Sequence, residues 1–325
     1  MARDVYEPCL CGSGRKLKFC CYRALSDIER IDRLLDNNQN RLALQALDDL
    51  LKKHANNRWA LIHRAFLHQE LGQLEEALAD VERLLAIDET HPLGVILQAR
   101  LRLERDGYAK SRGAIQRAFQ RAGRKVRDEA ASLALEIASR LRMDHPMACR
   151  RYLMLAMDLW EDEDYQLEAF LILVRLETDD SVPYPLRGPR ELLSPSDESD
   201  PPEELRTALK LARVGCFDAA AGLFRKLADQ SPENPLYWYN AGLCHAWDAN
   251  PRRAAEALHR AAGCASDFED AVEWETLAQL LELSLDEHKT GYVFRCVPTD
   301  SASRVISVLD EQLGWPRADL ENVKG

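Results

Sequence analysis

Four of the nine cysteines in this 325-residue chain lie within thirteen residues, as Cys9, Cys11, Cys20 and Cys21. Two disulfides would require the adjacent Cys20 and Cys21 to bridge back to Cys9 and Cys11, with Cβ atoms about 3.5–4.5 Å apart in each pair. One tetrahedral Zn²⁺ instead satisfies all four thiolates at once, with Zn–S bonds of about 2.3 Å. The spacing therefore favours a zinc site over a pair of disulfides.

A zinc ion held by four cysteines has no open coordination position for water, so the predicted site is structural and not catalytic. Its binding energy is then folding energy for residues 1–25, which we call the knob. The knob carries five Lys or Arg residues against two Asp or Glu residues. We predict that its basic residues form a partner-binding surface, and these are Arg15, Lys16, Lys18 and Arg23.

The segment from Cys9 to Cys21 resembles the SEC-C motif, a small zinc-binding segment of the translocation ATPase SecA and of other bacterial proteins. The family pattern is C-P-C-G-S-G-K-K-aromatic-K-x-C-C/H, and all four ligand positions and the Gly12-Ser13-Gly14 turn match it. Leu10 replaces the usual proline and Leu17 the usual aromatic residue, which we expect to weaken any partner contact of that aromatic. The resemblance implies that the knob docks on a ribosome, a chaperone or the translocase.

The sequence after the knob is helical in pattern and repeats every 34 residues. Small residues and expected turns recur at this spacing, in Ala43, Ala77 and Ser111, in Asn38, Gly72 and Asp106, and in Ala220 and Ala254. This pattern resembles the tetratricopeptide repeat, in which each copy is a pair of helices. The resemblance implies an all-α fold, a tetratricopeptide-like helical solenoid with the zinc knob at its N-terminal end.

Changes in composition divide the chain into five segments. We predict the knob at 1–25, N-terminal repeats at 26–177, a proline-rich acidic linker at 178–203, C-terminal repeats at 204–287 and a small strand–helix tail at 288–325. Six prolines in the linker exclude a helix there, so it is either extended between the two halves or laid across the surface. The alternation of Tyr292, Phe294 and Cys296 predicts the strand of the tail.

Tetratricopeptide arrays bind peptides in a groove lined by the first helix of each copy, and the resemblance transfers this role to six residues. The groove positions are Trp59, Ile62, Phe66, Tyr239, Leu243 and Trp247. Exposed there, the aromatic side chains would anchor a bound protein or peptide. The alternative is that they pack internally or against the linker, since aromatic residues at helical spacing are more often core than site.

A basic stretch without acidic residues runs from Gly107 to Arg127. Four of its residues share one helix face by spacing, namely Lys110, Arg117, Arg121 and Arg124. This face would suit RNA, the ribosome or an acidic protein segment. A solvated outer face is the favoured interpretation, because runs of charge usually are that.

The bulk composition limits the partners and the compartment. A net charge of −11 argues against a general nucleic-acid binder and leaves nucleic acid a secondary partner. The five other cysteines are scattered, which indicates a reducing compartment. No apolar run approaches the 18 residues that a membrane span requires. We expect a cytoplasmic protein without a membrane partner.

The sequence contains no recognisable catalytic constellation. The histidines form no H-E-x-x-H pattern, and no P-loop, G-x-S-x-G or dinucleotide fingerprint is present. Arg64 and His68 share a helix face and are expected to be satisfied polar groups at a repeat interface. We therefore predict a non-enzymatic zinc-binding adaptor or scaffold for protein–protein interaction. The alternative is an RNA- or ribosome-binding accessory subunit that uses the knob and the basic face.

Overall fold

The computed structural model of the protein describes residues 4–11, 14–195 and 201–284. Over these residues the chain folds into thirteen α-helices and three short 3₁₀ helices. The predicted all-α, tetratricopeptide-like fold is confirmed for this part of the chain. The strand–helix tail predicted at 288–325 lies outside the described residues.

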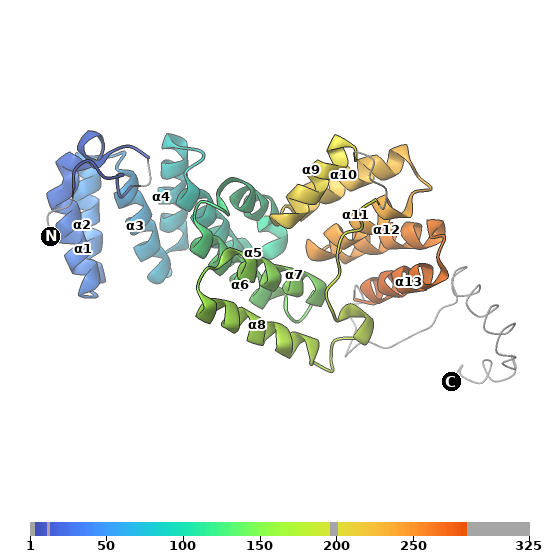
Figure 1. Cartoon of the computed structure of the whole chain (residues 1–325). Helices are drawn as coiled ribbons and strands as arrows, with labels where there is room; N and C mark the ends of the chain where they lie inside the picture. The colour runs from blue at the N-terminus through green and yellow to red at the C-terminus, as the bar shows by residue number, and fades with distance from the viewer. Residues whose placement is uncertain (1–3, 12–13, 196–200, 285–325) are drawn as a thin grey trace, which may run out of the picture. The chain divides into compact units, whose positions relative to one another are not determined.

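The helices follow one another along the chain with short connections, except for the long one between α8 and α9 (Figure 1). In order they are η1 (Leu17–Phe19), η2 (Tyr22–Ala24), α1 (Leu25–Asp36), α2 (Asn40–Lys53), α3 (Arg58–Glu70), α4 (Leu74–Ile87), α5 (Pro92–Ala122), α6 (Arg127–Leu141), α7 (Pro146–Leu159), α8 (Glu163–Glu177), η3 (Tyr184–Leu186), α9 (Glu203–Arg213), α10 (Phe217–Gln230), α11 (Pro235–Trp247), α12 (Pro251–Cys264) and α13 (Phe268–Leu283).

The chain divides into two compact units. The first contains the described residues up to 137 together with 155–167, and the second contains 138–154 together with the described residues from 168 to 284. The described residues of the linker predicted at 178–203 lie within the second unit. Each unit therefore has a core of its own and is described by itself below.

The 34-residue period is visible in the backbone of the turns. Asn38 and Gly72 end the first helices of two copies with φ of 55° and 72°, and Gly107 follows with φ of 76°. In the second unit Gly215 and Ala249 stand 34 residues apart with φ of 85° and 50°. Left-handed backbone is easy for Gly, tolerable for Asn and strained for Ala. Five helix pairs therefore close through a left-handed residue, namely α1–α2, α3–α4, the two halves of α5, α9–α10 and α11–α12.

The third copy departs from the expected turn at Asp106. α5 consists of two helical halves that meet at a kink. Gly107 is the non-helical residue between them, with φ of 76° and ψ of 173°. Gly107 has no Cβ to clash in this conformation, so the chain changes direction over one residue.

Capping side chains start several of the helices. Oδ1 of Asn234 accepts from the amide of Leu236 at 3.1 Å, and Oδ1 of Asn250 accepts from the amide of Arg253 at 3.4 Å. Each cap is followed by proline, whose fixed φ suits the first helical turn. This Asn-Pro pair recurs at the starts of α11 and α12 and explains why both helices begin where they do.

Close contact between paired helices fixes where the small residues stand. A Cβ added to Gly242 on α11 would lie 2.7 Å from Cγ of Leu258 on α12, so only glycine permits this approach. The side chains of Phe217 and Phe224 on α10 are fully buried in the second unit. Apolar burial of this kind supplies most of the stability of such a helical pair.

The ion pairs of Arg64 join helices α2, α3 and α4. Arg64 on α3 donates from Nε to Asp80 on α4 at 2.7 Å, and from Nη1 to Asp48 on α2 at 2.6 Å. Asp80 is only 2% exposed, so the guanidinium is what compensates its charge. His68 contacts Gln73 through Nδ1 at 2.7 Å. Both side chains therefore have polar partners, as predicted, but only Arg64 reaches a neighbouring repeat, because the contact of His68 lies within its own repeat.

Candidate metal centre and docking surface

A short hairpin in the knob brings its cysteines together. The amide of Cys9 donates to the carbonyl oxygen of Arg15 at 2.7 Å, and the amide of Leu17 donates to that of Glu7 at 2.9 Å. Gly14 turns the chain with φ of 69°, while Gly12 and Ser13 lie outside the described residues. These contacts return the chain so that η1 and η2 present the second cysteine pair to the first.

The four predicted ligands lie in one cluster. Their Sγ atoms all lie within 4.8 Å of one another, with 3.4 Å between Cys11 and Cys20 and 3.8 Å between Cys20 and Cys21. These separations exceed a disulfide bond of about 2.05 Å, and all four cysteines are free thiols. A regular tetrahedron with Zn–S bonds of about 2.3 Å sets its sulfurs about 3.8 Å apart. The sulfur positions therefore fit a four-cysteine zinc centre.

The raised pKa values of two of these thiols also agree with a site that binds a cation. Burial raises the pKa of Cys9. The pKa of Cys21 is raised by its hydrogen bond with Cys11 and then by burial. Crowded, buried sulfurs cannot all ionise without positive charge among them, and a divalent ion would supply that charge and displace the protons.

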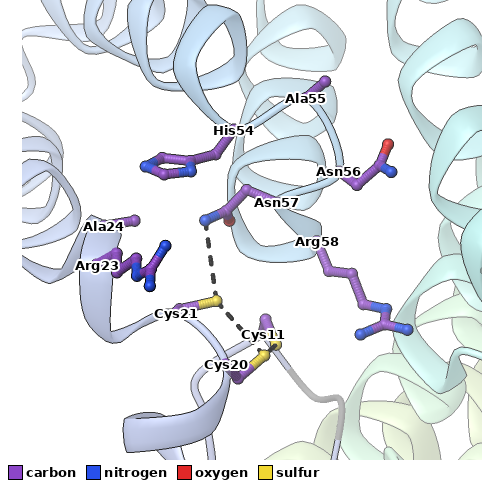
Figure 2. Close-up of a pocket in the computed structure, with 10 residues that line it drawn as sticks. All are labelled: Cys11, Cys20, Cys21, Arg23, Ala24, His54, Ala55, Asn56, Asn57 and Arg58. Atoms are coloured by element: carbon purple, nitrogen blue, oxygen red, sulfur yellow. Dashed lines mark hydrogen bonds between the residues drawn. The ribbon is translucent and has the colours of Figure 1, made fainter.

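Two side chains from the helical repeats hold the knob in place. Asn57, which caps α3, directs Nδ2 at Sγ of Cys21, 3.8 Å away (Figure 2). His91, which caps α5, contacts the carbonyl oxygen of Cys11 through Nε2 at 2.8 Å. Such contacts to a cysteine ligand and its backbone orient a metal site from outside. Neither partner was foreseen from the sequence, because Asn57 and His91 are distant from the cysteines along the chain.

A cavity of about 420 Å³ opens beside the sulfur cluster. Figure 2 shows it bordered on one side by Cys11, Cys20, Cys21, Arg23 and Ala24 of the knob, and on the other by residues 54–58 of the α2–α3 connection. The knob is thus packed against the first two helix pairs at the sulfur cluster and is accessible beside it.

The four basic residues predicted as the knob's binding surface are all exposed. Nζ of Lys16 and Nζ of Lys18 stand 5.7 Å and 5.1 Å from the ring centroid of Tyr6, within cation–π range. Arg15 and Arg23 complete the set. The ammonium groups are therefore held on the outside of the knob while the sulfur atoms face inward.

Sequence reasoning missed the aromatic part of this surface. Tyr6, Phe19 and Tyr22 are 54%, 68% and 52% exposed, although Phe19 and Tyr22 are directly next to a cysteine. Leu17 is only 2% exposed, and the expectation that the loss of the usual aromatic residue weakens a partner contact stays a prediction. Its side chain belongs to the apolar cluster that the knob shares with helices α1 to α3. The exposure of these rings could have been predicted from the sequence, because the knob is too short to bury several aromatic side chains.

The six predicted groove residues are mostly buried. Trp59, Ile62, Tyr239, Leu243 and Trp247 are all at most 6% exposed, and Phe66 is half-buried. The rings of Tyr239 and Trp274 have centroids 4.9 Å apart, and the Trp59 ring lies 4.1 Å from that of His63. Their burial agrees with the internal-packing alternative, and their role as peptide anchors stays a prediction.

The basic face lies on the second half of α5 and just after it. Its residues are exposed, and they are Lys110, Arg117, Arg121 and Arg124. Arg121 donates from Nη1 to the carbonyl oxygen of Glu89 at 3.2 Å, which ties one member to the preceding connection. Among the described residues, no helix is both long and apolar enough to cross a membrane.

A scan against protein-family models found none that matches this chain, and a search of curated proteins found no match. Among solved structures, it is similar to YrrB, a TPR protein with an unusual peptide-binding site, at 18% identity over 72% of this chain and 99% of that one, with a TM-score of 0.32. It is similar to a tetratricopeptide repeat protein from Parabacteroides merdae at 17% identity, over 76% of this chain and 80% of that one, with a TM-score of 0.30. It is similar to PilW, a type IV pilus biogenesis factor, at 12% identity over 82% of this chain and 97% of that one, with a TM-score of 0.25. The fold assignment rests on the helices of this chain, and the SEC-C resemblance stays a prediction.

Proposed function

We propose that this protein is a cytoplasmic, non-enzymatic adaptor whose zinc-stabilised knob docks it on one partner while its helical repeats hold another protein. The observation that carries the proposal is the division of the knob into two sides. Four sulfur atoms gather inside it within 4.8 Å of one another, and its lysines and aromatic rings stand outside. A structural metal would stabilise the inner side, which leaves the outer side free to contact a partner.

The outer side of the knob indicates what it would bind. Lys18 is placed between the exposed rings of Tyr6 and Phe19, with Nζ 5.1 Å and 5.8 Å from their centroids. Exposed aromatics are typical anchors at interfaces, and neighbouring ammonium groups favour acidic partners. An acidic protein segment with an apolar residue fits this surface. By the SEC-C resemblance, the candidates that could supply it are the ribosome, a chaperone and the translocase.

The docking test uses a surface variant that leaves the cysteines intact. We expect Lys18→Glu/Phe19→Ser to weaken binding of the knob's partner at least tenfold, because it removes both the charge and the aromatic anchor. Binding of purified ribosomes, an export chaperone and the translocase ATPase to the immobilised full chain would measure this. Lys210→Glu, an exposed charge reversal on α9, is the matched control. Equal binding by the unaltered chain, the double variant and the Lys210→Glu control would refute the proposal. The absence of binding to any of the candidate partners would refute it as well.

A second candidate function is an RNA- or ribosome-binding accessory subunit. The exposure of Lys110, Arg117, Arg121 and Arg124 favours it, because phosphate contacts need accessible cations. Sedimentation with ribosomes that falls steeply between low and high salt would support this candidate. Binding that survives high salt would instead support capture of a protein segment.

A further inference from the structure

A segment without regular structure lies against the helices of the second unit. We call residues 187–195, which follow η3, the strap. Figure 1 shows the chain leaving η3 and passing α11 on its way to α9. Of the two predicted states of the proline-rich linker, the strap therefore adopts the one laid across the surface.

One buried side chain holds the strap by its backbone. Nδ2 of Asn240 on α11 donates to the carbonyl oxygen of Leu193 at 2.8 Å, and Oδ1 of Asn240 accepts from the amide of Leu193 at 2.8 Å. Asn240 is 0% exposed, so these two bonds satisfy an amide that would be costly to bury unpaired. The Leu193 side chain is 38% exposed. Asn240 thus recognises the peptide group, and the identity of the side chain is not read.

An arginine three residues earlier fixes the direction of the strap. Nη2 of Arg190 lies 3.2 Å from Oε1 of Glu273 on α13, and it also donates to the carbonyl oxygen of Pro185 at 2.7 Å. The Arg190 side chain is 12% exposed, whereas the Glu273 side chain is 51% exposed. The carboxylate therefore reaches the guanidinium from the solvent side of a cavity of about 660 Å³ that both residues line.

These contacts together form a site for an extended peptide. An asparagine that pairs with one peptide group, and a carboxylate that pairs with an arginine three residues before it, would accept any extended segment with that spacing. The chain's own strap meets this description and is held at a high effective concentration because it is tethered. The strap has a further contact with a helix, in which the amide of Gly188 donates to Oε2 of Glu177 on α8 at 2.7 Å. An irregular segment that is held by polar contacts of this kind can be exchanged, since ordering it costs conformational entropy.

We propose that the α11–α13 face is a peptide-binding site, that the strap fills it as an internal ligand, and that an extended partner segment with an arginine three residues before its backbone contact displaces the strap. The proposal rests on the proposed function only in that a protein partner supplies the displacing segment. The knob takes no part in it.

The test is fluorescence anisotropy with a labelled synthetic peptide of residues 187–195 and the full chain. The double variant Arg190→Ala/Leu193→Pro removes the strap's guanidinium and its paired amide without touching α11. We expect it to bind the peptide at least tenfold more tightly than the unaltered chain, because the internal ligand no longer competes. Leu193→Ala is the matched control, since it keeps both backbone groups, and we expect it to bind like the unaltered chain.

Two further measurements identify the contacts. Methylating the amide nitrogen of the peptide's Leu193 equivalent removes the donor to Asn240, and we expect at least a tenfold loss of binding to the double variant. Adding Glu273→Gln to that variant changes an exposed side chain, so folding is not at stake, and we expect a severalfold loss.

Equal binding by the unaltered chain and the double variant would overturn the proposal, and so would the absence of binding to both. Undiminished binding of the methylated peptide would overturn it as well. None of these results bears on docking through the knob, so failure here and failure of the proposed adaptor function are separable.

Discussion

His91 at the start of α5 donates from Nε2 to the carbonyl oxygen of Cys11, 2.8 Å away and 80 residues earlier in the chain. Its Nδ1 accepts from the amide of Gly94 at 3.3 Å, which identifies the neutral tautomer with its proton on Nε2. One imidazole therefore caps a helix of the repeats and fixes the loop that carries a predicted metal ligand.

Replacing this histidine should loosen the knob without removing its sulfur ligands. We expect His91→Leu to lose about 1–3 kcal/mol of unfolding free energy, because a helix cap and the partner of a buried carbonyl are removed together. Urea unfolding measures the loss, and faster amide hydrogen exchange in residues 14–24 locates it. His54→Leu, on the other side of the neighbouring cavity, is the control and should change stability by less than about 0.5 kcal/mol. If amide hydrogen exchange in the knob is the same in His91→Leu as in the unaltered chain, His91 does not hold the knob against the helical repeats.

Local patterns in the sequence were enough to predict the cysteine cluster and the helical repeats. The spacing of Cys9, Cys11, Cys20 and Cys21 lies within one short segment, and the 34-residue period depends on neighbouring helices. Which knob residues are buried could not be predicted, because burial depends on packing against helices far along the chain. Leu17 is buried and Phe19 exposed for this reason.

Two equivalent turns should respond in opposite directions to exchange of glycine and alanine. Ala249 and Gly215 both have left-handed φ, at 50° and 85°. Ala249→Gly should stabilise the protein by up to about 1 kcal/mol, since relief of roughly 1–2 kcal/mol of strain exceeds the entropy cost of glycine. Gly215→Ala should destabilise it by about 1 kcal/mol or more. Thermal unfolding of both variants provides the comparison, and a loss of stability in Ala249→Gly would show that this turn is not strained.

The proline-rich linker shows the limit of sequence reasoning in the second unit. Its prolines correctly excluded a helix, but its attachment depends on Asn240 and Leu193, which are 47 residues apart. Nothing in the composition of the linker marks Leu193 as a held position. The buried Asn240 stands among apolar residues of α11, and only the folded chain brings its partner to it.

The stability of the second unit should depend on pH through His259. Burial alone would lower the pKa of His259, but its hydrogen bond to Glu275 at 2.8 Å and the nearby Glu282 outweigh this and raise it. A raised folded pKa stabilises the protein fully below about pH 6.5 and loses this contribution as pH rises through the folded pKa. The difference in unfolding free energy between the unaltered chain and His259→Gln should therefore shrink by about 0.5–1 kcal/mol as the pH rises above the folded pKa of His259.

A buried histidine in the first unit serves as the control of opposite sign. Burial lowers the pKa of His63 to about 4, so its neutral form is favoured in the folded chain. The stability difference between the unaltered chain and His63→Gln should therefore grow, not shrink, as pH rises through about 6.5. Urea unfolding across this pH range measures both variants. A difference for His259→Gln that stays constant or grows would rule out the ion pair with Glu275 as a source of stability.

Zinc content is the decisive measurement for the proposed adaptor, because that proposal requires the cysteines of the knob to hold a metal. We expect atomic emission to find about one zinc per full-length chain purified without chelator, and almost none in Cys20→Ser. Cys264→Ser, which removes a cysteine outside the cluster, should retain the full amount. An unaltered chain that contains no zinc and takes up none from solution, or a Cys20→Ser variant that holds as much as the unaltered chain, would contradict the zinc-stabilised knob.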